Sequence, residues 1–351
     1  MPKSAPKPAT TPATRAKRAT IRDVAAQANV SIGTVSRVVS RTAHVSDHLS
    51  QRVLSVAEEL GYRPRPRASS RPKTPRVRLI SCFVSDLSNL LYGYVVSAAE
   101  ERLAQLGYTL VVANTRNESR REDELMSLLR EKVVEGAIIS FGEETRPTLG
   151  AELAKAGIPA VILDRTPPKG IDSVLIDHRD GAANACSYLI GLGHKRIGLI
   201  TASLQVRPGQ ERVAGFMQAH AQAGLKVADG MIRAECSTAD AAFAESMKLL
   251  RQPERPTALM TLGSQALGGT LRAIRECGLS IPQDVSVICF GDTEMAKVVD
   301  PAITCVQWDR WQLGRQAVDL LVQRISNRVT EARTVILPTE IILRQSCQPP
   351  R

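Results

Sequence analysis

The chain has 351 residues, of which 43% are hydrophobic and 23% charged, and its formal net charge is +11 at pH 7. This length exceeds one ordinary hydrophobic core, so we expect two or three domains. No apolar run approaches the roughly 20 residues that span a bilayer, and the N-terminal region has no hydrophobic segment of the signal-peptide kind. The seven cysteines are scattered without a CxxC pair, which predicts buried reduced thiols in a cytoplasmic protein instead of a zinc site or a disulfide framework.

The positive charge is concentrated in the first part of the chain. Residues 1–76 contain 15 Lys and Arg against four acidic residues, a net charge of +11, so residues 77–351 balance to zero. Cations gathered beside one small domain neutralise phosphates and release counterions, which indicates a nucleic-acid partner. Residues 1–18, rich in Pro, Ala, Thr and Lys, are expected to be a disordered basic tail, and a role in solubility alone explains their charge equally well.

Three short helices are predicted between residues 19 and 63. Thr20 can cap the first helix, with Asp23 placed where a carboxylate favours the exposed backbone N–H groups. Asn29 suits the turn that follows, since Asn tolerates the left-handed backbone conformation. Ser31 can cap a second helix, and a third can begin at Ser46 and stop at residue 61, a glycine.

The second of these helices has a face suited to DNA. Its valines at 35, 38 and 39 recur at helical spacing and face inward. Its outward residues are mostly small, polar or basic: Ile32, Gly33, Thr34, Ser36, Arg37 and Ser40. This arrangement predicts that the second helix contacts nucleic acid.

A proline-rich linker follows at residues 64–76. Prolines at 64, 66, 72 and 75 remove backbone donors and restrict their predecessors, so only Arg67 to Arg71 can form an uninterrupted helical turn.

Beyond the linker, strand and helix patterns alternate, which predicts right-handed βαβ units and parallel sheets covered by helices. Together they fit two doubly wound lobes with a ligand cleft between them at the carboxyl ends of the strands. The expected strands are 77–84, 109–113, 136–140, 160–163, 196–201, 258–262, 285–290 and 336–344, and the expected helices are 94–106, 120–132, 149–156, 181–192, 211–223, 239–250, 265–276 and 311–326.

From residue 20 to about 347 the sequence resembles the LacI/GalR family of bacterial transcription regulators. The segment TIRDVAAQANVSIGTVSRVVSRTAHVS (20–46) is very similar to the DNA-binding signature of that family. Further similar stretches are DLSN (86–89), RRED (120–123), GIPAVILDR (157–165), LGHKRIGLIT (192–201), RVAGF (212–216), IPQDVSVICFGD (281–292) and LPTEIILRQSC (337–347).

The resemblance implies an N-terminal all-α helix-turn-helix domain of three helices and an α/β core of two doubly wound parallel-sheet lobes, similar to periplasmic binding proteins. We place the helix-turn-helix domain at 19–63 and the core at 77–347. The first lobe is expected at about 77–177 and 308–333, and the second at about 178–307 and 334–347. Three crossovers are then expected near Asp177, Gln307 and Thr334.

By the same resemblance, the second helix enters the major groove of an operator. Ile32, Gly33 and Arg37 occupy the base-reading positions of the family, and Arg suits paired hydrogen bonds with guanine. The positions that match phosphate or groove-edge contacts are Thr20, Ile21, Ser31, Thr34 and His44. For Thr20 and Ser31 simple helix capping is compatible with this role, and for His44 a solvated loop imidazole is an equal alternative.

The linker departs from the family pattern. Relatives have a hinge helix with an Asn near its start and a Leu that wedges into the central minor groove, and the aligned positions here are Arg65 and Arg71. Arginine does not unstack bases as an apolar wedge does, but it fits a narrow, electronegative minor groove. We therefore predict minor-groove contacts by Arg67 and Arg71 without strong kinking.

The core is expected to bind a small effector and to form a homodimer on a near-palindromic operator. Asp164 and Arg212 match polar residues that hold sugar hydroxyls in relatives, while two usual hydroxyl anchors read Gly263-Ser264 and Gly291-Asp292 here. We expect a sugar or sugar acid held by Tyr92, Asp164, Arg212, Asp292, Trp308 and Arg310. Hinge packing is an equal alternative for Trp308.

Other classes of function fit the sequence less well. The sequence lacks GxSxG, P-loop, HExxH and dinucleotide-binding motifs, so we expect no enzymatic activity, cofactor or metal. A secreted sugar receptor would not carry the basic helical domain at residues 19–63. A nucleoid-type DNA-binding protein without an effector would leave the large neutral core unexplained. The closest alternative is a constitutive repressor with a degenerate effector pocket.

Arg71→Ala tests the minor-groove hypothesis. The substitution is expected to weaken binding most on operators with A/T-rich centres, because those centres have the narrowest grooves. Gel-shift titrations on operators that differ only at the centre measure these affinities. An unchanged preference for A/T-rich centres in Arg71→Ala would contradict the hypothesis.

Overall fold

The computed structural model describes residues 19–40, 45–62, 77–142, 148–263, 265–326 and 331–351. The chain divides into two compact units, residues 1–76 and residues 77–351. The predicted tail, the linker, and His44, Arg67 and Arg71 lie outside the described residues. No described helix is long and apolar enough to cross a membrane.

The first unit contains the three predicted helices, which are α1 (Ile21–Gln27), α2 (Ile32–Ser40) and α3 (Asp47–Glu59). Their shared core is small, and Val24, Val35 and Val53, one from each helix, are fully buried in it. Asn29 has the left-handed φ of 50° that the turn requires. The local signals in the sequence therefore correctly predicted this unit.

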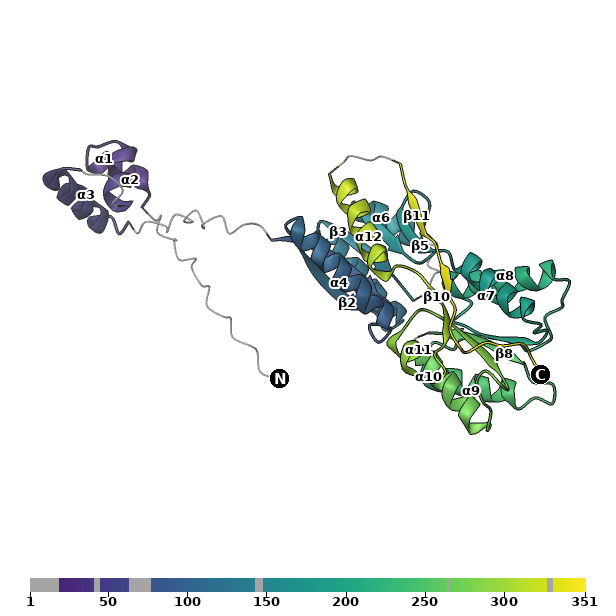
Figure 1. Cartoon of the computed structure of the whole chain (residues 1–351). Helices are drawn as coiled ribbons and strands as arrows, with labels where there is room; N and C mark the ends of the chain where they lie inside the picture. Colours follow the sequence, from purple (N-terminus) through teal and green to yellow (C-terminus); the bar gives the residue numbers. More distant parts are fainter. Residues whose placement is uncertain (1–18, 41–44, 63–76, 143–147, 264, 327–330) are drawn as a thin grey trace, which may run out of the picture. The chain divides into compact units, whose positions relative to one another are not determined.

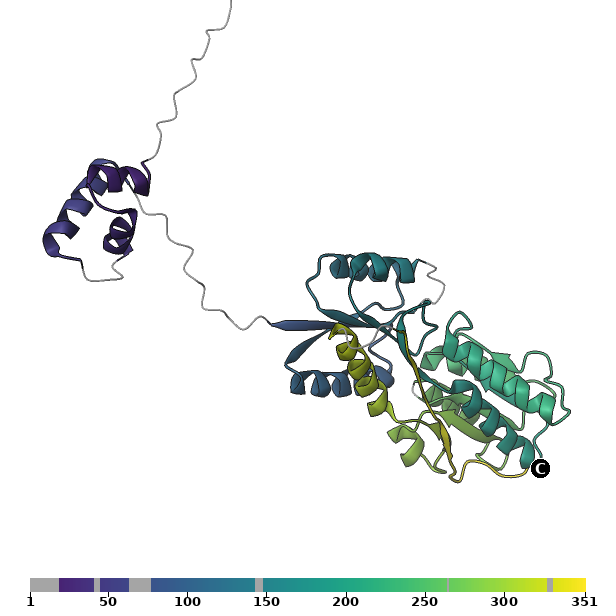
Figure 2. The same cartoon turned by 90° about the horizontal axis from the view of Figure 1, so that it is seen from above.

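The first lobe of the second unit is a six-stranded parallel sheet in the order β11-β5-β4-β3-β1-β2. Buried side chains of α4 and α12 pack on one face and those of α5 and α6 on the other. Figure 2 shows helices on both sides of this sheet. The elements are β1 (Arg78–Val84), α4 (Leu90–Gln105), β2 (Tyr108–Asn114), α5 (Ser119–Arg130), β3 (Gly136–Ser140), α6 (Leu149–Ala156), β4 (Ala160–Leu163), β5 (Asp172–Ile176), α12 (Arg310–Ile325) and β11 (Thr334–Leu337).

The second lobe repeats this architecture, with strand order β12-β10-β9-β8-β6-β7, and Figure 1 shows α7 and α8 on one side of β8 and α9 and α10 on the other. Helices α7 and α8 pack on one apolar cluster, and α9, α10 and α11 on another. All strand pairs are parallel except β10–β12, which is antiparallel. The elements are α7 (His178–Gly191), β6 (Ile197–Ile200), α8 (Arg207–Gln222), β7 (Ile232–Arg233), α9 (Ala239–Leu250), β8 (Ala258–Leu262), α10 (Gln265–Glu276), β9 (Ser286–Phe290), α11 (Glu294–Val298), β10 (Thr304–Gln307) and β12 (Glu340–Ile342).

The third crossover between the lobes lies later than predicted. Residues Thr334–Leu337 pair with β5, so they belong to the first lobe and not to the second. The predicted strand 336–344 is in fact two strands in two sheets, β11 and β12. Pro338 separates them because proline has no backbone N–H to continue a ladder. The other two crossovers lie at Asp177 and between β10 and α12, as predicted.

Four short elements were not predicted: β5, β7, β10 and α11. Strand β5 begins with Asp172, a residue that is rare in strands. Here its carboxylate is fully buried and paired with Arg324, at 2.7 Å between Oδ2 and Nε. The partner is 152 positions away in sequence, so no local pattern reveals it.

Candidate DNA-binding helix and effector cleft

The start of α2 is held by its own side chains. The Ser31 hydroxyl oxygen accepts a hydrogen bond from the backbone N–H of Thr34 at 3.1 Å and lies 2.9 Å from the Thr34 hydroxyl. Ile32 is 47% exposed, and Gly33 and Arg37 are also exposed. The Nε–H of Arg37 donates to the backbone oxygen of Gly33 at 3.2 Å. The three predicted base-reading residues therefore lie on one accessible face of α2.

Thr20 and Ile21 have local roles in the structure. Both the backbone N–H and the hydroxyl of Thr20 donate to the Asp23 carboxylate at 2.7 Å, which fixes the first turn of α1. Ile21 is half-buried against the core of the three helices. Helix capping by Thr20 and Ser31 is thus present, and their contacts with DNA remain predictions.

In the second unit, a cleft of about 430 Å³ lies between the two lobes and is lined by residues of both. The carboxyl ends of the strands border it, as expected for doubly wound sheets. Five of the six predicted effector-binding residues line it: Tyr92, Asp164, Arg212, Trp308 and Arg310.

Asp292 does not line the cleft, so the structure gives no support to its predicted role. Its carboxylate accepts a hydrogen bond from Arg344 at 2.8 Å, and Lys297 lies 3.9 Å away. Arg344 comes from the C-terminal segment after β12, and this distant partner engages the side chain.

A buried polar chain joins Asp164, at the end of β4, to α8. The Asp164 Oδ2 atom lies 2.9 Å from His178 Nε2, and His178 Nδ1 lies 3.1 Å from Arg212 Nη2. The exposed fractions of Asp164, His178 and Arg212 are 4%, 2% and 6%. Arg207 adds a contact, with Nη1 3.6 Å from Asp164 Oδ1. Sequence analysis missed His178, because the strand that precedes it, β5, was not predicted either.

Burial and neighbouring charges fix the protonation of this chain. Burial, reinforced by the positive charge of Arg212, lowers the pKa of His178 to about 4. Burial would raise the pKa of Asp164, but interactions with His178, Arg165 and Arg212 hold it below its usual value. Burial lowers the pKa of Arg212 to about 10, so the guanidinium stays charged at neutral pH. A neutral imidazole therefore lies between a carboxylate and a guanidinium.

Two buried donors of the cleft residues have no hydrogen-bond partner among the described residues. They are Nε of Arg212 and Nε1 of Trp308. Unpaired buried donors are costly, and each calls for an acceptor from solvent or a ligand. Arg212 also lies over the ring of Phe290, at 5.2 Å from its centroid.

Three further lining residues, Tyr92, Arg165 and Arg310, already contact other protein groups. The Tyr92 hydroxyl lies 2.8 Å from the hydroxyls of Ser85 and Ser140. Arg165 donates from Nε to the Phe141 carbonyl at 2.7 Å. Arg310 stacks over the Tyr94 ring at 4.1 Å.

The absence of a side chain at residue 263 has a steric cause. The N–H of Gly263 donates to the Phe290 carbonyl at 2.7 Å. A Cβ atom at 263 would lie 2.3 Å from the Gly291 oxygen and 2.5 Å from the Phe290 oxygen, both backbone atoms. This wall of the cleft therefore excludes an anchoring side chain by backbone contact.

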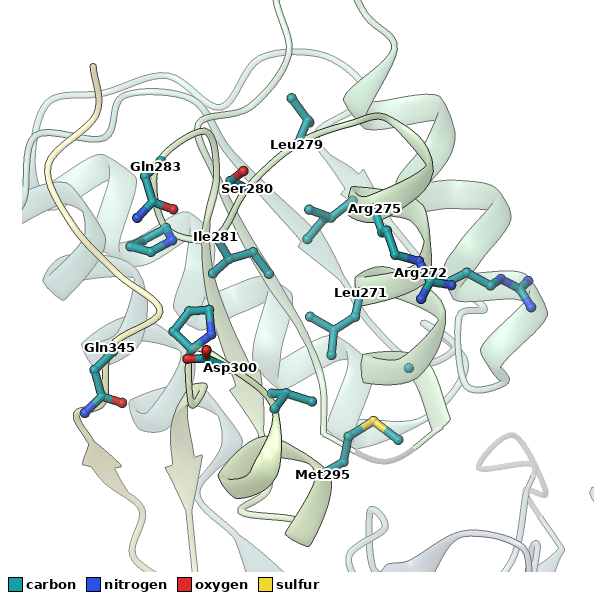
Figure 3. Close-up of a pocket in the computed structure, with 15 residues that line it drawn as sticks. Leu271, Arg272, Arg275, Leu279, Ser280, Ile281, Gln283, Met295, Asp300 and Gln345 are labelled. Carbon is teal, nitrogen blue, oxygen red and sulfur yellow. The ribbon is translucent and has the colours of Figure 1, made fainter.

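A second hollow, of about 1180 Å³, lies on the second lobe between α10, α11 and residues 279–283 and 299–301. Figure 3 shows apolar Leu271 and Ile281 in it, while Arg272 points away. Arg272 pairs with Asp240 at 3.2 Å. None of the six predicted effector residues lines this larger hollow, so size alone does not identify the predicted site.

Comparison with known proteins agrees with this architecture. Residues 20–65 match the model for bacterial regulatory proteins of the lacI family, and residues 186–347 match the periplasmic binding protein-like domain. The chain is 32% identical over 330 residues to the HTH-type transcriptional repressor PurR of Escherichia coli O139:H28, covering 93% of this chain and 96% of PurR.

Solved structures give the same result. A complex of the transcriptional regulator CelR with cellobiose has a TM-score of 0.72 and 28% identity, covering 94% of this chain and all of that one. The lac repressor dimer bound to operator and the anti-inducer ONPF has a TM-score of 0.71 and 29% identity, covering 95% and 100%.

A helix-turn-helix unit and a two-lobed core with a polar cleft define a DNA-binding transcriptional regulator. The chain belongs to the lacI family of bacterial regulatory proteins.

The depressed pKa of His178 predicts a loss of stability in acid. Its pKa is 6.5 in an unfolded chain and about 4 in the fold, so the unfolded state takes up a proton first as the pH falls. The free energy of unfolding should therefore decrease between pH 6.5 and 4 by about 1–3 kcal/mol from this group, and be unaffected by it above that window.

Urea unfolding of the wild type and of His178→Asn at each pH measures this contribution as their difference. A pH slope that is the same in both proteins across this window would contradict the assignment.

Proposed function

We propose that the chain represses transcription as a homodimer on a near-palindromic operator, and that an anionic small molecule bound between the lobes controls its affinity for DNA. Relatives named as repressors, and a neighbour solved as a dimer on operator, support the first part. The observation that carries the second part is the buried, charged Arg212 with an unpaired Nε.

At the operator, α2 of each copy lies in the major groove. Ile32, Gly33 and Arg37 read bases from its exposed face, and the guanidinium of Arg37 reaches the groove edge alongside the bare backbone of Gly33. Contacts with phosphates or groove edges come from Thr20, Ile21, Ser31, Thr34 and His44. Arg67 and Arg71 reach the minor groove.

In the cleft, the effector is held by its negative charge. Arg212 supplies a cation that is only 6% exposed, and electrostatic attraction is stronger at such a buried group than in bulk water. Gly263 and Gly291 leave no side chain there to anchor hydroxyls, which disfavours a neutral hexose. Tyr92, Trp308 and Arg310 complete the contact surface, and Asp164 orients the polar chain at the inner end.

Effector control follows from differential affinity for two arrangements of the lobes. Contacts already cross the mouth of the cleft, since the Gln265 side-chain amide donates to the Ser88 hydroxyl at 3.2 Å. Deeper inside, Arg207 of the second lobe donates to the Ile176 carbonyl of the first at 3.0 Å. A ligand that bridges both lobes favours the arrangement in which these contacts form.

The missing hydroxyl anchors also favour a second candidate, a constitutive repressor with a degenerate pocket. The two candidates differ in ligand-induced stabilisation. A thermal-shift screen with anionic and neutral metabolites separates them, because only a functional pocket raises the melting temperature.

Arg37→Ala should remove base discrimination. We expect specific affinity to fall by about 1–3 kcal/mol, roughly 5- to 150-fold, with little change on non-specific DNA. Arg52→Ala is the charge-matched control. Arg52 is an exposed residue of α3, and its loss should weaken binding to all DNA sequences equally. Fluorescence titrations on operator and scrambled DNA measure both, and equal losses on the two DNAs for Arg37→Ala would contradict the assignment.

Arg212→Gln tests the effector class. Isothermal calorimetry of the wild type should show binding of sugar acids such as gluconate but not of glucose. The variant should lose at least about tenfold in affinity, because an Arg–carboxylate hydrogen bond contributes about 1.5–3 kcal/mol. Arg179→Gln, on α7 outside the cleft, is the control. Binding of neutral hexoses alone would contradict the proposal.

A further inference from the structure

The two ends of the buried polar chain carry opposite charges but do not touch. Asp164 and Arg212 are bridged only through the His178 ring, by contacts of 2.9 Å and 3.1 Å. No carboxylate of the described residues forms an ion pair with Arg212. Such separation is unusual, because a buried guanidinium next to a carboxylate ordinarily forms a bidentate pair.

The hydrogen-bond roles in this chain are determined by chemistry. A guanidinium has donors only, so Nδ1 of His178 must be the acceptor for Arg212. The proton of the neutral ring is then on Nε2 and is donated to Asp164. A second ring proton would point at a donor, so the geometry requires a neutral imidazole. Trp308 packs edge-on against this ring, with centroids 5.7 Å apart, and limits its rotation.

Asp164 has other partners that stabilise its charge. Its Oδ1 accepts from the Ile176 backbone N–H at 3.2 Å and lies 3.6 Å from Arg207 Nη1. The charge of Arg165 also acts on Asp164 and Arg212, so the cluster of Asp164, Arg165, Arg207 and Arg212 holds one negative and three positive charges. The excess positive charge of this cluster therefore lies beside the cleft that Asp164 and Arg212 line.

We infer that His178 is a positioning residue, a neutral spacer that keeps Arg212 from pairing with Asp164 and so leaves its guanidinium available to an anionic effector. This inference rests on the proposed effector class. It assigns to His178 a role in ligand affinity although the residue does not itself line the cleft.

The spacer can be tested by removing it and then removing the carboxylate behind it. His178→Ala removes the ring that separates Arg212 from Asp164, so these two side chains should form an ion pair. The affinity for gluconate should then fall at least about tenfold. His178→Asn should stay within about threefold of the wild type, because its side-chain oxygen can accept from Arg212 in place of Nδ1. The double variant His178→Ala/Asp164→Asn should recover most of the affinity, since the competing charge is gone.

These affinities are measured by calorimetry with gluconate and with inorganic phosphate on the full chain. His194→Asn is the control. This buried histidine forms hydrogen bonds with the Thr257 hydroxyl and the Gln348 carbonyl, away from the cleft, so its substitution should leave the affinity unchanged. Asp164→Asn alone gives the baseline for the double variant. An unchanged affinity in His178→Ala, or a double variant as weak as His178→Ala, would overturn the inference.

A second readout does not depend on a ligand. In the ¹⁵N spectrum of histidine-labelled protein at pH 7, the His178 signals, identified by their loss in His178→Asn, should show an unprotonated Nδ1 and a protonated Nε2. A protonated Nδ1 would overturn the spacer role. If the wild type binds neither anion, the proposed effector class fails, and this spectrum still decides the arrangement of the chain.

Discussion

The buried guanidinium of Arg212 is the constraint around which the core is arranged. Removing such a charge from water costs several kcal/mol unless hydrogen bonds and an opposite charge offset it. Here the fold supplies one neutral acceptor, the His178 ring, and leaves Nε unpaired. The two lobes therefore enclose a site that is electrostatically incomplete, and this is the physical basis of the proposal that the effector is an anion.

The part of the cleft around Gly263 is specified by backbone packing. Gly263 lies against the chain that follows β9, with the N–H of Gly263 bonded to the Phe290 carbonyl. Because no Cβ fits there, hydroxyl recognition by a side chain at 263 is sterically closed. The charge of Arg212 and the absence of a side chain at residue 263 both support the proposal that the ligand is recognised by its charge.

The two units of the chain are stabilised in different ways. The helix-turn-helix unit has a small core, and helix caps and a left-handed turn at Asn29 help to define it. The core instead depends on strand pairing over long sequence separations, as in β5 with β11. A regulator combines the two because DNA contact needs only one exposed helix, whereas ligand response needs two lobes that enclose a site.

The sequence by itself determined the features that depend on neighbouring residues: the capping of α1 and α2, the alternation of strands and helices, and the basic charge of residues 1–76. Five of the six residues predicted to bind the effector also line one cleft, because the carboxyl ends of parallel strands meet at one edge. Only the tertiary structure decided the pairing of Asp292 with Arg344, the switch of lobes at Pro338 and the place of His178 between Asp164 and Arg212. These depend on partners far away in sequence, and a side chain's hydrogen-bond partner is set by the packing of whole elements and not by its neighbours along the chain.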